Sequence, residues 1–252
     1  MTDSHADPSR APHDSLPGEF SPGLLRRLIV EPLLTPVLTR FLGPGQVMRA
    51  SQFEQFPAPE SHVVLLGDSI TELGLWQEWF PGLPVSNRGI GGQVSIDLLR
   101  RLDTAIGRPA AVFLLIGTND LTFGVPLHEI VRNVRALLSE IERRAPGTPV
   151  VVQSVMPRTR RYRDDLVLLN CAYRSVVEHS PDHVEYLDLW PALANESGDL
   201  RAEFTEDATH LTGAGYAAWM QLLRPQVGRF ITPSDPSTGI SSPTFTDAEG
   251  HP

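Results

Sequence analysis

Five short apolar runs, separated by segments with helical spacing, constrain the fold of this chain more than any other feature. The runs occupy residues 62–67, 85–89, 110–117, 149–155 and 184–189. Around them, apolar residues recur at three- and four-residue steps over 95–106, 127–141, 165–179 and 213–229, which indicates helices. Strands that alternate with helices form right-handed crossovers and a parallel sheet covered on both faces. We therefore predict an α/β fold, a single three-layer α/β/α domain around a five-stranded parallel sheet.

The loops that follow the first three strands carry the residues suited to chemistry. They read Gly67-Asp68-Ser69-Ile70-Thr71, then N-R-G-I-G-G-Q over 87–93, then Gly117-Thr118-Asn119-Asp120. Sites in open parallel sheets form beyond the carboxyl ends of the strands. A serine at a strand-to-helix turn exposes its hydroxyl, glycines leave backbone N–H groups unshielded, and an asparagine amide donates a hydrogen bond without charge. Each loop taken alone also fits a helix cap or a tight turn.

An acid and a histidine stand three residues apart near the C-terminus, in Asp207-Ala208-Thr209-His210. This spacing predicts both side chains on one side of a helical turn. There the carboxylate can fix the imidazole tautomer and stabilise the imidazolium, as the acid of a catalytic triad does. Asp188, at the end of the fifth strand, is the alternative acid, but it has no fixed spacing to His210.

The order of these four blocks, G-D-S, G-x-G-G, G-T-N-D and D-x-x-H, resembles the SGNH hydrolases, also called the GDSL esterase family. The stretch Trp76-Gln77-Glu78-Trp79-Phe80 and the N-x-G-I-G-G loop are most similar to the platelet-activating-factor acetylhydrolase Ib catalytic subunits and their bacterial relatives. The resemblance covers about residues 60–228 and implies the flavodoxin-like SGNH hydrolase fold. The first block departs from the usual Gly-Asp-Ser-Leu motif of the family, because Ile70 replaces the leucine.

The resemblance implies a role for five residues. Ser69 would be the nucleophile, His210 the general base and then acid, and Asp207 the residue that orients His210. The oxyanion hole would consist of the N–H groups of Ser69 and Gly92 and the side-chain amide of Asn119. The implied activity is a serine esterase that hydrolyses acetyl or other short-chain esters through an acyl-enzyme intermediate.

Three other functions remain open on the same residues. An acyltransferase would use the same acyl-enzyme with an alcohol as acceptor, and a lysophospholipase or thioesterase would differ only in the substrate. A non-catalytic binding protein on the same fold is disfavoured, because such a protein is expected to have lost at least one of the five residues.

Composition excludes several chemistries and partners. The 21 basic residues are all arginine, so a Schiff base, a pyridoxal phosphate enzyme and a P-loop lysine are excluded. Cys171 is the one cysteine, and no cluster of metal ligands is present, so we expect neither a metal nor a cofactor. No basic stripe interleaved with aromatics supports nucleic-acid binding. In the arginine-rich loop after the fourth strand, Arg160 and Arg161 are candidates to bind an anionic group of the substrate.

The predicted hydrolase domain spans residues 59–230 and leaves segments at both ends. Residues 1–20 and 231–252 are predicted to be disordered tails, and most of the net charge of −9 lies in them. Residues 21–58 are predicted to form a helical arm, in which Pro32 and Pro36 indicate two short helices, with Pro32 near the start of the second.

The apolar residues at 24–42 predict a helical face that packs on the domain itself or makes a peripheral membrane or dimer contact. The sequence has neither a signal-peptide pattern nor a membrane-length apolar run, so we expect a cytoplasmic protein.

Overall fold

A computed structural model describes residues 31–231, with side chains from Gly43 onward. Its centre is a five-stranded sheet in the order β2-β1-β3-β4-β5, with every pair parallel. The strands are β1 (Val63–Gly67), β2 (Val85–Gly89), β3 (Ala111–Leu115), β4 (Val150–Gln153) and β5 (Val184–Leu187). All five predicted strands are present, and the predicted α/β fold with a parallel sheet is confirmed.

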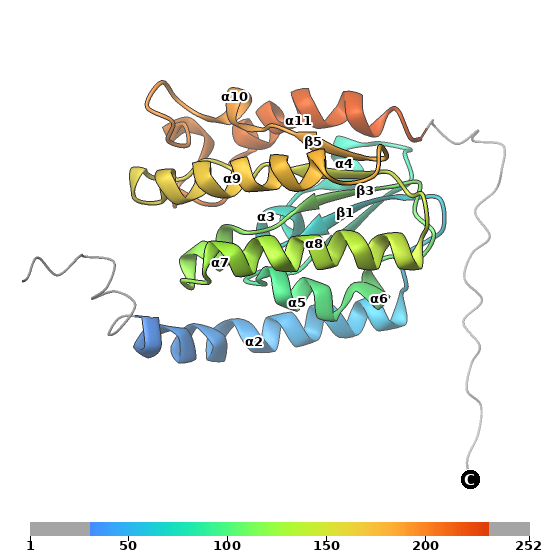
Figure 1. The fold of residues 1–252 in the computed structure, drawn as a ribbon, viewed down its shortest axis with the longest axis horizontal. Helices are drawn as coiled ribbons and strands as arrows, with labels where there is room; N and C mark the ends of the chain where they lie inside the picture. The colour runs from blue at the N-terminus through green and yellow to red at the C-terminus, as the bar shows by residue number, and fades with distance from the viewer. Residues whose placement is uncertain (1–30, 232–252) are drawn as a thin grey trace, which may run out of the picture.

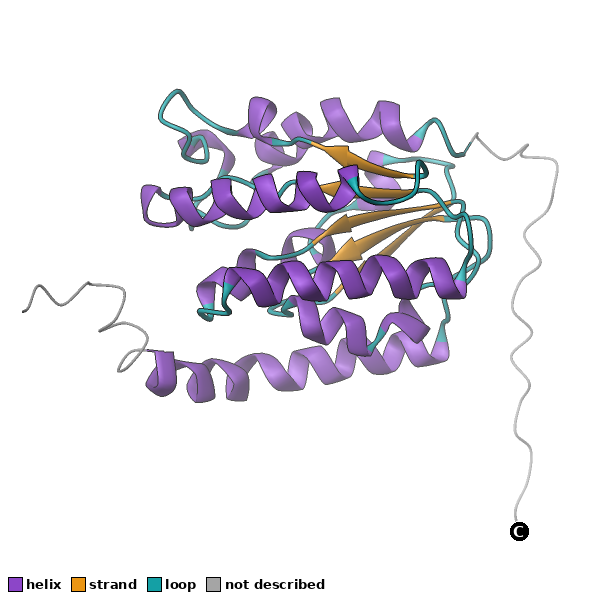
Figure 2. Cartoon of the chain, in the orientation of Figure 1, coloured by secondary structure: helices purple, strands orange, loops and turns teal. Residues whose placement is uncertain are grey.

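The helices form the two outer layers (Figures 1 and 2). Those in the described part of the chain are α2 (Glu31–Gln55), α3 (Ser69–Glu72), α4 (Trp76–Trp79), α5 (Ser95–Arg100), α6 (Leu102–Ala105), α7 (Thr118–Thr122), α8 (Leu127–Arg144), α9 (Arg163–Glu178), α10 (Trp190–Leu193) and α11 (Gly213–Val227), with short 3-10 turns η2 (Arg160–Tyr162) and η3 (Ala202–Phe204). One core cluster joins the sheet to α5, α6, α8 and α9, and a second joins it to α3, α4, α10 and α11.

Alternation along the strands divides the core between these two layers. In β1, Val64 and Leu66 belong to the cluster under α5 and α8, whereas Val63 and Leu65 belong to the cluster under α11. Trp76 of α4 and Trp219 of α11 fill the second cluster edge to face, with ring centroids 5.2 Å apart. Both faces of the sheet are therefore buried, as the continuous apolar runs of a parallel sheet require.

Helix α2 runs unbroken from Glu31 to Gln55, so its start agrees with the prediction that Pro32 lies near the beginning of the second helix of the arm. The first of the two predicted helices would precede Glu31 and lies outside the described residues. The break indicated by Pro36 does not occur, and the second helix is longer than predicted. Pro32 lies in the first turn, where its missing N–H has no intrahelical partner to lose, and Pro36 removes a single hydrogen bond from a helix of 25 residues. Within residues 31–231, no helix is long and apolar enough to span a membrane.

Several predictions for the two ends of the chain fall where the structure gives no description. The tails at 1–20 and 232–252, and the contact predicted for the apolar residues at 24–42, lie outside the described backbone or side chains. Ile231, the first residue of the predicted C-terminal tail, is buried in the core beside α11. The core therefore reaches one residue beyond the predicted domain boundary.

Candidate active site

Ser69 lies at the carboxyl end of β1, as the first residue of α3. Asp68 caps this helix, because its side chain accepts a hydrogen bond from the N–H of Ile70 at 3.0 Å. The turn depends on Gly67, since a Cβ atom there would collide with the side chain of Thr71 and with the carbonyl oxygen of Leu115. Close packing against β3 therefore directs the serine to the edge of the sheet where the other loops meet.

His210 meets Ser69 across 141 positions of sequence. Its Nε2 lies 2.8 Å from Oγ of Ser69, and its Nδ1 lies 2.5 Å from Oδ2 of Asp207. Asp188 is elsewhere, because its carboxylate accepts hydrogen bonds from Arg174 at 3.2 Å and from the N–H of Trp190 at 3.1 Å. Of the two candidate acids, Asp207 is therefore the one that contacts the imidazole of His210.

The segment that holds Asp207 and His210 is not the helical turn that the spacing predicted. Ala208 adopts a left-handed conformation with φ of +62°, which ends any helical continuation. Oδ1 of Asp207 instead accepts hydrogen bonds from the backbone N–H groups of Thr209 at 2.9 Å and His210 at 2.7 Å. One carboxylate thereby shapes the turn and orients the imidazole.

The carboxylate of Asp207 is held in its ionised form. Partial burial raises its pKa, but the hydrogen bonds from the His210 side chain and from the N–H groups of His210 and Thr209 outweigh this effect and lower the pKa to about 2. An ionised carboxylate only accepts hydrogen bonds, so the proton of the contact belongs to Nδ1 of His210. Nε2 is then the nitrogen that can take a proton from Ser69.

A cavity of about 350 Å³ opens beside the serine and the histidine. Its lining comes from separate segments of the chain and consists of Gly45, Gln46, Ser69, Glu72, Gly91, Gly92, Asn119 and His210. Gly92 has φ of +73°, which favours glycine. Asn119 uses one N–H of its amide to bind the carbonyl oxygen of Gln93 at 3.0 Å. The described residues offer no hydrogen-bond partner to its second N–H or to the N–H of Gly92.

The loops that carry Gly92 and Asn119 are tied together by a buried acid. Asp120 accepts hydrogen bonds from Ser95 through the backbone N–H at 3.0 Å and through Oγ at 2.5 Å. Asn133 of α8 in turn donates to Oγ of Ser95 at 2.9 Å. Burial raises the pKa of Asp120, and the hydrogen bonds from Ser95 oppose that rise. The network keeps the glycine loop beside the asparagine.

Asp68 is a second buried acid, directly before the serine. Burial raises its pKa to about 7, the N–H of Ile70 opposes the rise, and the charge of Asp120 adds to it. Both acids hold loops in place through hydrogen bonds, and neither lines the cavity.

The predicted substrate-binding arginines do not line this cavity. Arg160 and Arg161 are exposed on the 3-10 turn η2, and their binding of a substrate anion stays a prediction. Arg158 is the arginine of the same loop that points inward, with Nη1 2.7 Å from Oγ1 of Thr122 and its guanidinium over the ring of Tyr162. It directly follows the buried residues 154–157 that continue from β4, whereas Arg160 and Arg161 on η2 are exposed.

Gln46 and Glu72 are cavity residues that sequence reasoning missed. Glu72 lies within α3, three positions after the serine, where the sequence offers only helical spacing as a signal. Gln46 belongs to α2, where no sequence motif marks a polar residue as part of a site. Its place in the cavity follows from the packing of α2 on the domain.

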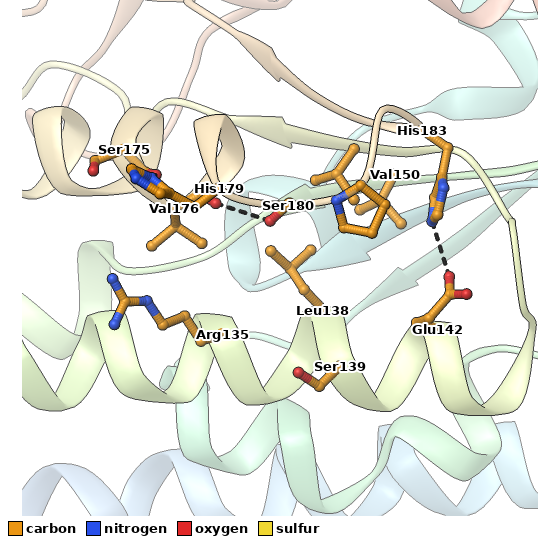
Figure 3. A pocket seen from close by; sticks show the side chains of 12 residues that line it. Arg135, Leu138, Ser139, Glu142, Val150, Ser175, Val176, His179, Ser180 and His183 are labelled. Carbon is orange, nitrogen blue, oxygen red and sulfur yellow. Dashed lines mark hydrogen bonds and ion pairs between the residues drawn. The ribbon is translucent and has the colours of Figure 1, made fainter.

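A larger cavity, of about 520 Å³, lies between α8 and α9 beside the first residues of β4 and β5. Figure 3 shows Glu142 and His183 in it, joined at 2.9 Å. Among the described residues, no serine hydroxyl of this cavity forms a hydrogen bond with a histidine ring. His62 and Ser86 form a serine–histidine contact of 2.9 Å in another cavity, but no described acid binds that imidazole. The serine–histidine pair with an acid on the second ring nitrogen lies in the smaller cavity, at the opposite end of the strands from Glu142 and His183.

Comparisons with known proteins agree with this geometry. The model of the GDSL-like Lipase/Acylhydrolase family matches residues 65–218. Platelet-activating factor acetylhydrolase IB subunit alpha1 of Bos taurus is 27% identical over 194 residues, which cover 73% of this chain and 82% of the bovine protein. The Homo sapiens subunit alpha1 is 28% identical over 182 residues, which cover 68% of this chain and 78% of the human protein.

Solved structures show the same likeness. A protein from Streptococcus pneumonia, described as a candidate platelet activating factor, superposes with a TM-score of 0.72 and 28% identity, and covers 78% of this chain and 99% of that one. A GDSL-like lipase from Bacteroides thetaiotaomicron superposes with a TM-score of 0.60 at 22% identity, over 73% of this chain and 97% of that one. The second match is a likeness of fold.

Proposed function

The chain belongs to the GDSL-like lipase/acylhydrolase family and is a carboxylic ester hydrolase, and from this premise we propose that it cleaves small acyl esters through an acyl-enzyme formed on Ser69. One observation carries the proposal: the chain of contacts from Asp207 through His210 to Ser69, at 2.5 and 2.8 Å, ends at the cavity. This arrangement suits the transfer of a proton from a serine hydroxyl to an imidazole.

In the first half of the reaction, Nε2 of His210 takes the proton of Ser69 as Oγ attacks the ester carbonyl. Asp207 stabilises the imidazolium that results. The carbonyl oxygen becomes an oxyanion, for which the N–H groups of Ser69 and Gly92 and the amide of Asn119 are the available donors. The tetrahedral intermediate then collapses, the carbon–oxygen bond to the alcohol breaks, and His210 returns the proton to the leaving oxygen.

In the second half, water attacks the acyl group on Ser69. His210 takes a proton from the water, a second oxyanion forms against the same donors, and the acid leaves as Oγ recovers its proton. The side chain of His210 is 38% exposed, which supports access of water to the acyl-enzyme. An acyltransferase would differ only in that an alcohol takes the place of this water.

The size and lining of the cavity favour a short acyl group. About 350 Å³ is at the lower end of the range for small-molecule sites, and polar side chains of Gln46, Glu72 and Asn119 border it. The acetylhydrolase names of the relatives point to the same class of ester. Lysophospholipids and thioesters are the alternative substrates.

A panel of p-nitrophenyl esters from acetate to decanoate tests the proposal, together with phenyl thioacetate and a lysophospholipid. We expect kcat/KM to be highest for acetate or butyrate and to be lost in Ser69→Ala. Added methanol should compete with water for the acyl-enzyme, so that part of the acyl group leaves as methyl ester in place of the free acid. Turnover that persists in Ser69→Ala would contradict the mechanism, and a maximum at decanoate would contradict the short acyl group.

A further inference from the structure

Helix α2 contributes to the cavity although it precedes the segment that the family model matches. The half-buried and buried positions 46, 49, 50 and 53 recur at helical steps, so this stripe of α2 faces the domain. Figure 2 shows the helix running along the domain beside α5 and α6. Gly45 and Gln46 reach the cavity from this helix.

Phe53 anchors α2 to the loops of the site. Its buried ring has the guanidinium carbons of Arg88, Arg49 and Arg101 at 4.5, 5.0 and 5.8 Å from its centroid. Arg101 also donates to the carbonyl oxygens of Gly67 at 3.2 Å and Arg88 at 2.9 Å. Burial lowers the pKa of Arg101 to about 9, and the charges of Arg88 and Arg49 add to that effect. The anchor thus connects α2 to the end of β1, directly before the nucleophile turn.

Both hydrogen-bonding groups of Gly91 are held by side chains. Its N–H donates to Oε2 of Glu72 at 2.7 Å, and its carbonyl oxygen accepts from Nε2 of Gln46 at 3.0 Å. Arg49 of α2 forms an ion pair with the other carboxylate oxygen of Glu72, at 3.4 Å. Gly91 is therefore held from one side by the nucleophile helix and from the other by α2.

The bond from Gln46 controls the orientation of the next N–H. The carbonyl of Gly91 and the N–H of Gly92 belong to one peptide unit, which is planar and trans, so the two groups point in opposite directions. With glycine on both sides, the dihedral angles that rotate this unit meet little steric resistance. A hydrogen bond that fixes the carbonyl of Gly91 also fixes the direction of the N–H of Gly92.

We propose that Gln46 is a positioning residue for the oxyanion hole, which acts through the Gly91–Gly92 peptide unit. Glu72 and Arg49 hold the opposite side of the same segment. The inference rests on the proposed function, because the direction of the Gly92 N–H affects the rate only if an oxyanion forms beside Ser69. Helix α2 is then part of the active site.

The experiment compares Gln46→Met with Gln52→Met in the full-length chain. The change removes the amide donor and keeps the length of the side chain, and Gln52 is an exposed glutamine of the same helix. For p-nitrophenyl acetate we expect kcat of Gln46→Met to fall about 10-fold with KM unchanged, less than the roughly 10²–10³-fold loss on removal of a direct oxyanion donor. Gln52→Met should match the wild type, and both variants should keep its melting temperature.

Equal kcat values for Gln46→Met and Gln52→Met would overturn the inference. A rise in the KM of Gln46→Met with kcat unchanged would also overturn it, because Gln46 would then only contact the bound substrate. If Gln46→Met also lowers the melting temperature, Gln46→Lys decides, because it restores an N–H donor of similar reach. Recovery of kcat supports positioning, and no recovery overturns it. Wild-type turnover in a Ser69→Ala variant would overturn the proposed function itself. That result is separate from the comparison of the two glutamines.

Discussion

Asp207 and His210 are joined twice, through Oδ2 of the acid and Nδ1 of the ring at 2.5 Å, and through Oδ1 and the backbone N–H of the histidine at 2.7 Å. The first contact sets the tautomer of the ring, and the second sets its distance from Ser69. A hydrogen bond that shapes the backbone therefore also places the imidazole against the hydroxyl of Ser69.

This relationship predicts that Asp207→Asn lowers kcat by roughly 10⁴-fold, because an amide can donate to Nδ1 and favour the wrong tautomer. The matched control is Asp188→Asn, which removes the charge of the acid that pairs with Arg174 instead. We expect that variant to keep wild-type kcat for p-nitrophenyl acetate. Comparable losses in the two variants would show that the acid had been misidentified.

Asn119 is predicted to stabilise the oxyanion through the amide N–H that does not bind Gln93. Replacing it by alanine should lower kcat by roughly 10²–10³-fold and leave KM nearly unchanged, because the donor is used mainly in the transition state. Steady-state kinetics gives the division between kcat and KM, and circular dichroism melting checks that the fold is retained. A variant with normal kcat would exclude Asn119 from the oxyanion hole.

Asp68 predicts a pH dependence of stability. In the folded protein burial raises its pKa from 3.8 to about 7, so between these values the folded state keeps a proton that the unfolded state has lost. The free energy of unfolding therefore falls as pH rises through that window. Above pH 7 the folded protein bears the full destabilisation of an ionised, buried Asp68. An asparagine side chain at this position would not titrate, and its oxygen could still cap α3.

Asp68→Asn should accordingly gain stability relative to the wild type between pH 4 and pH 8, by an amount on the order of 1–4 kcal/mol. Urea unfolding of both proteins at pH 4, 6 and 8 measures the difference. Asp120 titrates in both proteins, so its contribution largely cancels in the difference between their unfolding free energies. A difference that stays constant across this range would show that Asp68 ionises at its ordinary pKa.

Gly67 is predicted to be required for the nucleophile turn. Gly67→Ala brings a Cβ atom into the carbonyl oxygen of Leu115, which belongs to the backbone of β3, and should cost about 1–3 kcal/mol of unfolding free energy. Gly213→Ala is the matched control, because nothing lies within 4 Å of a Cβ at that position. The control should be neutral or slightly stabilising, since alanine restricts the unfolded chain. Equal stability of the two variants would refute the close-packing explanation.

The sequence by itself determined the class of fold and the order of the site loops. Apolar runs and helical spacing report local burial, which is why all five strands were predictable from residues such as Val63–Gly67 and Ala111–Leu115. The carboxyl ends of parallel strands meet at one edge of a sheet, so the loops with Ser69, Gly92 and Asn119 could be expected to meet as well.

Only the tertiary structure decided how the distant parts meet. The spacing of Asp207 and His210 predicted a helical turn, but Ala208 adopts a left-handed conformation that no spacing rule reveals. The sequence already favoured Asp207 over Asp188, but the contact itself depends on where β5 and the last loop lie relative to Ser69. Gln46 enters the site because Phe53 docks α2 among three arginines. Local patterns record which residues are buried, whereas contacts between distant segments depend on the packing of whole elements.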